Sequence, residues 1–189
     1  DETSLLPLQG SFVADQHLNA GSGTYELSVK YKDQGGEPVG SLTREKTVSL
    51  RHPKVEAESH DERYQCRPRQ PSETNYAFMS DMRDGSYFTF ENFDLKNVNA
   101  LQARVAANEV GLTLQVRLDA ADGKVIAEAS VPATGSNAEW TNIDLPLQQS
   151  PSGVHTLYFV TQGSSAGAKA AVDWIYFQSN QFEQRVASR

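Results

Sequence analysis

The chain has one cysteine, Cys66, among 189 residues. A single cysteine cannot close an internal disulfide or build a cysteine-based zinc cluster. No run of 18 apolar residues occurs, so the sequence predicts no membrane span. Basic residues are also in deficit, because 17 Lys and Arg stand against 24 Asp and Glu, for a formal net charge of -7. Phosphate binding needs a clustered basic surface, so this balance argues against a nucleic-acid partner.

The four histidines lack the spacing of a known zinc-binding motif. The chain begins at Asp1 rather than at methionine, with no signal-like segment, so we expect a processed protein or a fragment with neighbouring domains missing. What the chain does have is a hydrophobic content of 38%, which suffices for a core. The length suits one large β domain or two small ones.

Two alternating segments, residues 24–31 and 47–51, predict a pair of strands, joined through turn-forming residues at 33–38. We expect the first strand to be half-buried, with Leu27, Val29 and Tyr31 on its apolar face. From residue 85 onward, strand patterns recur with turns between them and no amphipathic helix. They cover residues 87–92, 101–107, 112–118, 125–131, 140–147, 153–160 and 171–177.

These patterns predict an all-β fold, a jelly-roll type β-sandwich preceded by a small β unit. We divide the chain into a β-rich segment at 1–52, the sandwich at 53–178 and a tail or linker at 179–189. Residues 59–84 are polar and lack periodicity, which predicts a long loop that is functional or partly disordered.

Glu56 and Glu58 lie two positions apart in a predicted strand at residues 55–58, so we expect both carboxylates on one face. Like charges on one face repel unless a cation lies between them. A metal clamp, a catalytic carboxylate pair and a solvated face are the three interpretations. Spacing alone favours the solvated face, because exposed glutamates are common.

Catalytic motifs are weak. Residues 163–167 match GxSxG, but a nucleophile elbow needs a helix after the serine, and here a strand follows. Glu56 and Glu58 on one strand are too close and too alike to divide acid and base roles in a glycosidase. His155 is expected to cap or flank a strand. The sequence therefore predicts a protein that is not an enzyme.

A series of short segments nevertheless resembles one family. The segments are Val-Glu-Ala-Glu at 55–58, Asp-Gly-Ser-Tyr at 84–87, Leu-Gln-Ala-Arg-Val-Ala at 101–106, the hairpin at 114–127, Val-Pro-Ala-Thr-Gly at 131–135 and Ala-Val-Asp-Trp-Ile-Tyr-Phe at 171–177. Together they resemble the family 6 carbohydrate-binding modules, calcium-containing β-sandwiches appended to polysaccharide-active enzymes. The resemblance implies a structural calcium held by Glu56, Glu58 and Asp173, and carboxylate oxygens suit that ion.

The resemblance also implies a sugar site between loops at one edge, built from two aromatics and an asparagine. In this chain those positions fall near residues 81–83, 136–138 and 170–171, which carry no ring. Tyr76 and Phe78, or Tyr64, are possible substitutes, with Asp81, Arg83 and Asn137 as hydrogen-bonding partners. The competing interpretation, which we favour, makes Tyr76 and Phe78 core residues. Trp140 corresponds to a core tryptophan and is expected to be buried.

By resemblance, the chain is a non-catalytic, calcium-stabilised module that targets a larger secreted bacterial enzyme to a polysaccharide or oligosaccharide. That function implies an extracellular or periplasmic location. Residues 24–51 resemble a β segment that precedes such modules in some large bacterial redox proteins, which implies catalytic or cytochrome domains elsewhere in the parent chain. The alternative is a structural or protein-docking module of a multidomain extracytoplasmic redox or hydrolytic protein that has lost the usual sugar site.

Overall fold

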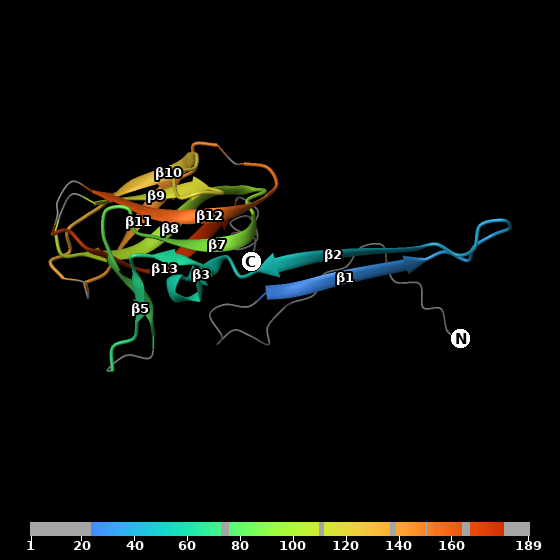
Figure 1. The fold of residues 1–189 in the computed structure, drawn as a ribbon, viewed down its shortest axis with the longest axis horizontal. Coiled ribbons are helices and arrows are strands. Elements are labelled where there is room, and N and C mark those ends of the chain that lie inside the picture. Colours follow the sequence, from blue (N-terminus) through green and yellow to red (C-terminus); the bar gives the residue numbers. More distant parts are fainter. Residues whose placement is uncertain are drawn as a thin grey trace, which may run out of the picture. The chain divides into compact units, whose positions relative to one another are not determined.

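The computed structural model describes residues 24–72, 76–109, 112–136, 139–149, 151–163 and 167–179 (Figure 1). Contacts within the chain divide it into two compact units, Asp1–Arg51 and His52–Arg189. Each unit is described separately below.

The first unit contains an antiparallel ribbon of two strands, β1 (Thr24–Lys32) and β2 (Thr43–Arg51). Asp33 closes the connection, because its Oδ1 accepts hydrogen bonds from the backbone nitrogens of Gly35 and Leu42, at 3.0 and 2.8 Å. The predicted strand pair is confirmed, but the half-buried face is not: Val29 and Tyr31 are 68% and 66% exposed. A ribbon of two strands is one layer thick, and the described residues of this unit, 24–51, supply no second layer to bury that face.

The second unit is a sandwich of two antiparallel sheets (Figure 1). One sheet has the order β10–β9–β12–β7–β4, and the other has the order β11–β8–β13–β6–β5, with β3 also paired to β13. The strands are β3 (Lys54–Glu56), β4 (Arg63–Tyr64), β5 (Arg67–Arg69), β6 (Phe78–Met82), β7 (Tyr87–Asp94), β8 (Val98–Ala107), β9 (Leu112–Leu118), β10 (Val125–Val131), β11 (Thr141–Pro146), β12 (Val154–Gly163) and β13 (Ala170–Ser179). The predicted all-β, jelly-roll type β-sandwich is confirmed.

Alternation along the strands explains the core. In β9, Leu112, Leu114 and Val116 are buried, while the residues between them are only half-buried. Aromatic rings fill the centre: Phe159 of β12 stacks on Phe88 of β7 at 5.0 Å and 7°, and the ring of Phe90 meets Phe159 edge-on at 5.6 Å. Such contacts combine large apolar area with favourable ring geometry.

The long loop predicted at 59–84 is wrong, because this stretch contains β4, β5 and β6. Phe78, Met79 and Ser80 are consecutive residues of β6 and all three are buried. Apolar and polar residues therefore do not alternate along this strand as they do in a half-buried one. Asp81 adds a left-handed backbone conformation with φ of 60°, beside a register shift in the pairing of β6 with β13. A strand that is buried on both faces and irregular in register gives no period-two signal.

Replacing Phe159 with alanine tests the aromatic core. Phe159 is fully buried, so Phe159→Ala is expected to lower the free energy of unfolding by about 3–5 kcal/mol, measured by denaturant titration. Val154 lies on the same strand but is 62% exposed, so Val154→Ala should change it by less than about 0.5 kcal/mol. Equal losses in the two variants would contradict this account of the core.

Candidate functional site

The two predicted glutamates lie where the first strand of the sandwich joins the last. Glu56 ends β3 and pairs with Trp174 of β13. The chain then enters a short 3-10 helix, η1 (Ala57–Ser59), in which Ala57 is fully buried. The expectation that Glu58 continues the strand and shares a face with Glu56 by alternation is therefore wrong. Burial of Ala57 in the core turns the chain and ends the strand.

Glu58 nevertheless lies close enough to Glu56 and Asp173 to be affected by their charges. The pKa of Glu58 is raised to about 7, mainly by burial, and the negative charges of Glu56 and Asp173 act in the same direction. Its Oε2 atom is buried and has no hydrogen-bond partner among the described residues. A buried carboxylate oxygen without a partner is costly, so this atom is suited to a ligand that supplies positive charge.

Two of the three acids already pair with cations. Arg104 Nη1 donates to Asp173 Oδ2 at 2.7 Å, and Lys54 Nζ donates to Glu56 Oε1 at 2.7 Å. Burial raises the pKa of Asp173, whereas the hydrogen bond and charge of Arg104 act in the opposite direction. Within the described ranges, no group of three or more His, Cys, Asp or Glu side chains is arranged to hold a metal ion. The assignment of calcium to these acids stays a prediction.

Three of the residues predicted to bind sugar, Tyr76, Asp81 and Arg83, lie on and beside β6. Tyr76 is 41% exposed, with its ring centroid 6.4 Å from that of Phe78. Phe78 is buried and meets the half-buried Trp140 edge-on at 5.1 Å, so Phe78 belongs to a small cluster on this side of the sheet. Asp81 Oδ2 accepts a hydrogen bond from Arg67 Nε at 2.7 Å. Arg83 is exposed, whereas Asn137 lies outside the described residues. Their role in sugar binding stays a prediction.

Three tyrosines form a row on the outer face of the five-stranded sheet. Tyr64 of β4 stacks on Tyr87 of β7 at 5.5 Å and 21°, and Tyr87 lies 5.3 Å from Tyr158 of β12. Tyr64, at the edge of the sheet, is 50% exposed, and the other two rings are half-buried. We call these three residues the tyrosine row.

The sequence alone singled out Tyr64 but missed the other two residues. Tyr87 and Tyr158 each occupy an outward position beside a core residue of its strand, Phe88 and Phe159. Their proximity follows only from the pairing of β7 with β12, which places Tyr158 opposite Thr89 and Val160 opposite Tyr87. That pairing could not be read from alternation in either strand.

Polar groups continue the same face beyond the tyrosine row. Arg117 of β9 lies opposite Tyr158, and its Nε and Nη2 donate to Gln115 Oε1 at 3.0 and 2.6 Å. Gln115 Nε2 in turn donates to Glu128 Oε2 at 3.0 Å. Sugars present apolar C–H faces to aromatic rings and hydroxyls to fixed polar groups. A face with both features is chemically suited to carbohydrate.

The remaining motif residues are His155, Cys66 and the serines of the GxSxG match. His155 Nδ1 lies 2.9 Å from Asp119 Oδ2, and Asp119 Oδ1 accepts from the backbone nitrogen of Thr156. His155 is the second residue of β12, so it lies within the strand and does not cap or flank it as predicted. Burial raises the pKa of the Cys66 thiol to about 11, which leaves little reactive thiolate at neutral pH. The serines of the GxSxG match lie outside the described residues. In the described part of the chain, no helix is long and apolar enough to cross a membrane.

A β-sandwich with an outward-facing row of aromatic rings has the architecture of a carbohydrate-binding module. Residues 56–179 match the sequence profile of the family described as "Carbohydrate binding module (family 6)". The chain belongs to this family.

The chain is similar to arabinoxylan arabinofuranohydrolases from Bacillus subtilis (strain 168) and Paenibacillus polymyxa. It is 30% identical to the first over 105 residues, which are 54% of this chain and 20% of that protein. It is 29% identical to the second over 104 residues, 54% of this chain and 16% of that protein. The chain thus matches a fifth or less of the length of these curated relatives.

Among solved structures, a family 6 carbohydrate-binding module from Clostridium cellulolyticum, in complex with xylose, has a TM-score of 0.61 and 28% identity. The match covers 67% of this chain and 96% of that module. A β-1,3-glucan-binding module of the family from Bacillus halodurans has a TM-score of 0.60 at 22% identity, covering 67% of this chain and 95% of that module, which supports the shared fold.

The pKa of Glu58 gives a testable pH dependence. Because the folded-state pKa is raised, to about 7 from an ordinary 4.5, the contribution of neutral Glu58 to stability is complete below pH 4.5. It is lost as the pH rises through about 7. In the presence of a chelator, we expect the free energy of unfolding to fall between pH 5 and pH 8, as measured by denaturant titration. Glu58→Gln should weaken this dependence, whereas the exposed Glu139→Gln should leave it unchanged, and an identical slope in all three proteins would contradict the assignment.

Proposed function

We propose that this module binds polysaccharide through the tyrosine row. The proposal rests on one observation: the Tyr64 ring is half exposed while it is stacked on Tyr87 at 5.5 Å. Tyr87 covers one face of the ring, which leaves the other face for a sugar. A ring held by its neighbour loses little conformational entropy when a ligand binds, so more of the contact energy is retained as affinity.

The polar side chains beyond the row would fix the orientation of the sugar. Gln115, Arg117 and Glu128 are joined by hydrogen bonds, so their donors and acceptors are already oriented. Similarity to proteins that act on arabinoxylan, and to a module solved with xylose, makes xylan-type polymers the first ligands to test. The loop-edge residues Tyr76, Asp81, Arg83 and Asn137 remain a second candidate site, in which only Tyr76 offers a ring.

We further propose that the module is non-catalytic and directs a larger extracellular or periplasmic protein to its polysaccharide. The described residues offer no nucleophile–base pair, and the matched relatives are several-fold longer than the matched region. A protein-docking role is the second candidate. It is favoured by the exposed side chains Leu27, Val29 and Tyr31 of β1, which are typical of a surface that meets another protein.

A structural calcium ion is the third part of the proposal. Glu56, Glu58 and Asp173 would hold it, and the unpartnered buried oxygen of Glu58 fits the oxygen ligands that calcium prefers. Glu56 and Asp173 each pair with Lys54 or Arg104 through one carboxylate oxygen, so the second oxygen of each would contact the ion. Bound there, the ion would tie β3 and η1 to β13 and remove the repulsion among the three carboxylates.

Alanine at Tyr64 tests the carbohydrate site. Stacking of a sugar on a tyrosine ring contributes about 1–2 kcal/mol, so Tyr64→Ala should weaken binding to xylan about tenfold, measured by isothermal titration calorimetry. Tyr31 is 66% exposed on the ribbon, so Tyr31→Ala serves as the matched control and should bind xylan as the parent chain does. Loss of binding in both variants, or in neither, would contradict the proposed site. Absence of binding to any polysaccharide would favour the protein-docking role.

Chelation and readdition of calcium test the metal site. A ligand present at about 100 times its Kd adds about 2.7 kcal/mol to folded stability, which in a domain of this size corresponds to about 5 °C or more in Tm. Calcium should therefore raise the Tm of the chelator-treated protein, measured by differential scanning calorimetry. Glu58→Gln should remove the response, and Glu139→Gln should retain it. A calcium response that survives Glu58→Gln would place the ion elsewhere, and no response in the parent chain would exclude a stabilising ion.

A further inference from the structure

Four arginines lie on β4, on β5 and on the turn after β6, at the end of the sandwich that carries Tyr64. Arg63 precedes Tyr64 in β4, Arg67 and Arg69 lie on β5, and Arg83 lies on the turn after β6. We call Arg63, Arg67, Arg69 and Arg83 the arginine edge. They lie on the surface of a chain whose formal net charge is -7, so this concentration of positive charge opposes the overall balance.

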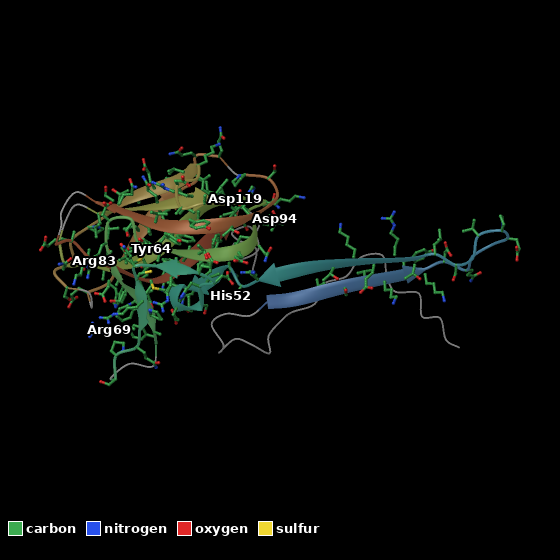
Figure 2. All side chains as sticks on the ribbon, viewed as in Figure 1. His52, Tyr64, Arg69, Arg83, Asp94 and Asp119 are labelled. Atoms are coloured by element: carbon green, nitrogen blue, oxygen red, sulfur yellow. The ribbon has the colours of Figure 1, made fainter. Side chains whose placement is uncertain are left out.

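Hydrogen bonds hold Arg63 and Arg83 near Tyr64. Ser86 Oγ donates to the backbone oxygen of Gln65 at 3.0 Å and accepts from the backbone nitrogen of Arg83 at 2.9 Å. The turn that carries Arg83 is thereby attached to the residue that follows Tyr64. Arg63 Nη1 donates to the backbone oxygen of Cys66 at 2.7 Å, which fixes the corner between β4 and β5. Figure 2 shows Tyr64, Arg69 and Arg83 at one end of the sandwich, with Asp94 and Asp119 at the other.

The positive charge of the arginine edge is only partly neutralised. Asp81 pairs with Arg67 at 2.7 Å and lies 4.0 Å from Lys169, so one carboxylate serves two cations. The side chains of Arg69 and Arg83 form no hydrogen bond or ion pair with the described residues. Asp84, the acid next to Arg83 in the sequence, accepts a hydrogen bond at its Oδ1 from the backbone nitrogen of Gly163 at 3.0 Å.

The other end of the tyrosine row carries charges of both signs. Burial raises the pKa of Tyr158, and the negative charges of Glu62 and Glu91 add to that effect. Arg117 of β9 lies opposite Tyr158. The end near Tyr64 differs, because two guanidinium groups of the arginine edge pair with no described residue. A neutral polymer would gain nothing from the charge of these groups. A polymer with an anionic group placed over the arginine edge would gain a charge-assisted, bidentate contact.

We propose that the polysaccharide bound by the tyrosine row carries anionic substituents, carboxylates of uronic acids or sulfate esters, and that the arginine edge recognises them. This inference rests on the proposed carbohydrate binding and specifies the class of ligand. Arg69 and Arg83 supply the contact, because Arg67 is engaged by Asp81. Sugar rings stack on Tyr64 while the anionic groups extend over β5 and the turn after β6.

Titration calorimetry on the full chain with calcium present compares four polymers: neutral arabinoxylan, glucuronoxylan, polygalacturonate and a sulfated galactan. We expect glucuronoxylan to bind more tightly than arabinoxylan, although both share a xylan backbone. Binding of the anionic polymers should weaken as sodium chloride rises from about 0.05 to about 0.5 M, because exposed charge pairs are screened by salt. The uronate and sulfate polymers separate the two sources of negative charge, and preferential binding of either supports the proposal.

The double variant Arg69→Gln/Arg83→Gln should bind the preferred anionic polymer about tenfold more weakly, with less than about a twofold change for arabinoxylan. Lys96→Gln/Lys124→Gln removes the same charge from two exposed sites away from the arginine edge and should leave both affinities unchanged. Equal affinity for neutral and anionic xylans, or equal losses in the two double variants, would overturn the proposal while leaving carbohydrate binding intact. If no polymer binds, the proposed function itself fails, and this inference fails with it.

Discussion

Backbone pairing of β13 on both of its sides is the constraint on which the sandwich depends. β8 hydrogen-bonds to one side of β13, while β6 and β3 share the other side. The last strand of the sandwich therefore joins its first strand, β3, to strands from the middle of the chain. The register with β8 shifts between Val172 and Trp174, which leaves Asp173 as an extra residue in the strand. This bulge allows a nearly buried carboxylate to lie beside Glu56 and Glu58 and to reach Arg104. The acidic site is thus a product of sheet irregularity.

Regular strands could be predicted from the sequence because their burial alternates. In β8, Leu101, Ala103 and Val105 are buried, as the pattern indicates. The prediction fails where tertiary contacts override local pattern: β6 is buried on both faces, and η1 forms because Ala57 enters the core just after β3. The prediction that one face of β1 is half-buried fails for a different reason. Alternation identifies an apolar face, but it does not show that a second layer is present to cover that face.

The candidate sites could be predicted in part. Resemblance to the family selected Glu56, Glu58 and Asp173, and the structure places them close enough to perturb one another. The resemblance could not reveal that Lys54 and Arg104 form ion pairs with two of the three acids, because those pairs depend on side-chain geometry. The tyrosine row and the arginine edge depend on strand order and on the corner at Gln65. Neither feature produces a periodic pattern in the sequence. Sites built across strands become visible only when the pairing is known.

The hydrogen bond from the backbone nitrogen of Phe177 to the oxygen of Pro53, 2.8 Å long, places the entry and exit of the sandwich beside each other. A unit whose two connections meet in this way can be spliced into a host protein at a single surface loop with little distortion of the host backbone. The same geometry suits it to domain shuffling in evolution, and to transplantation as a cassette in protein engineering.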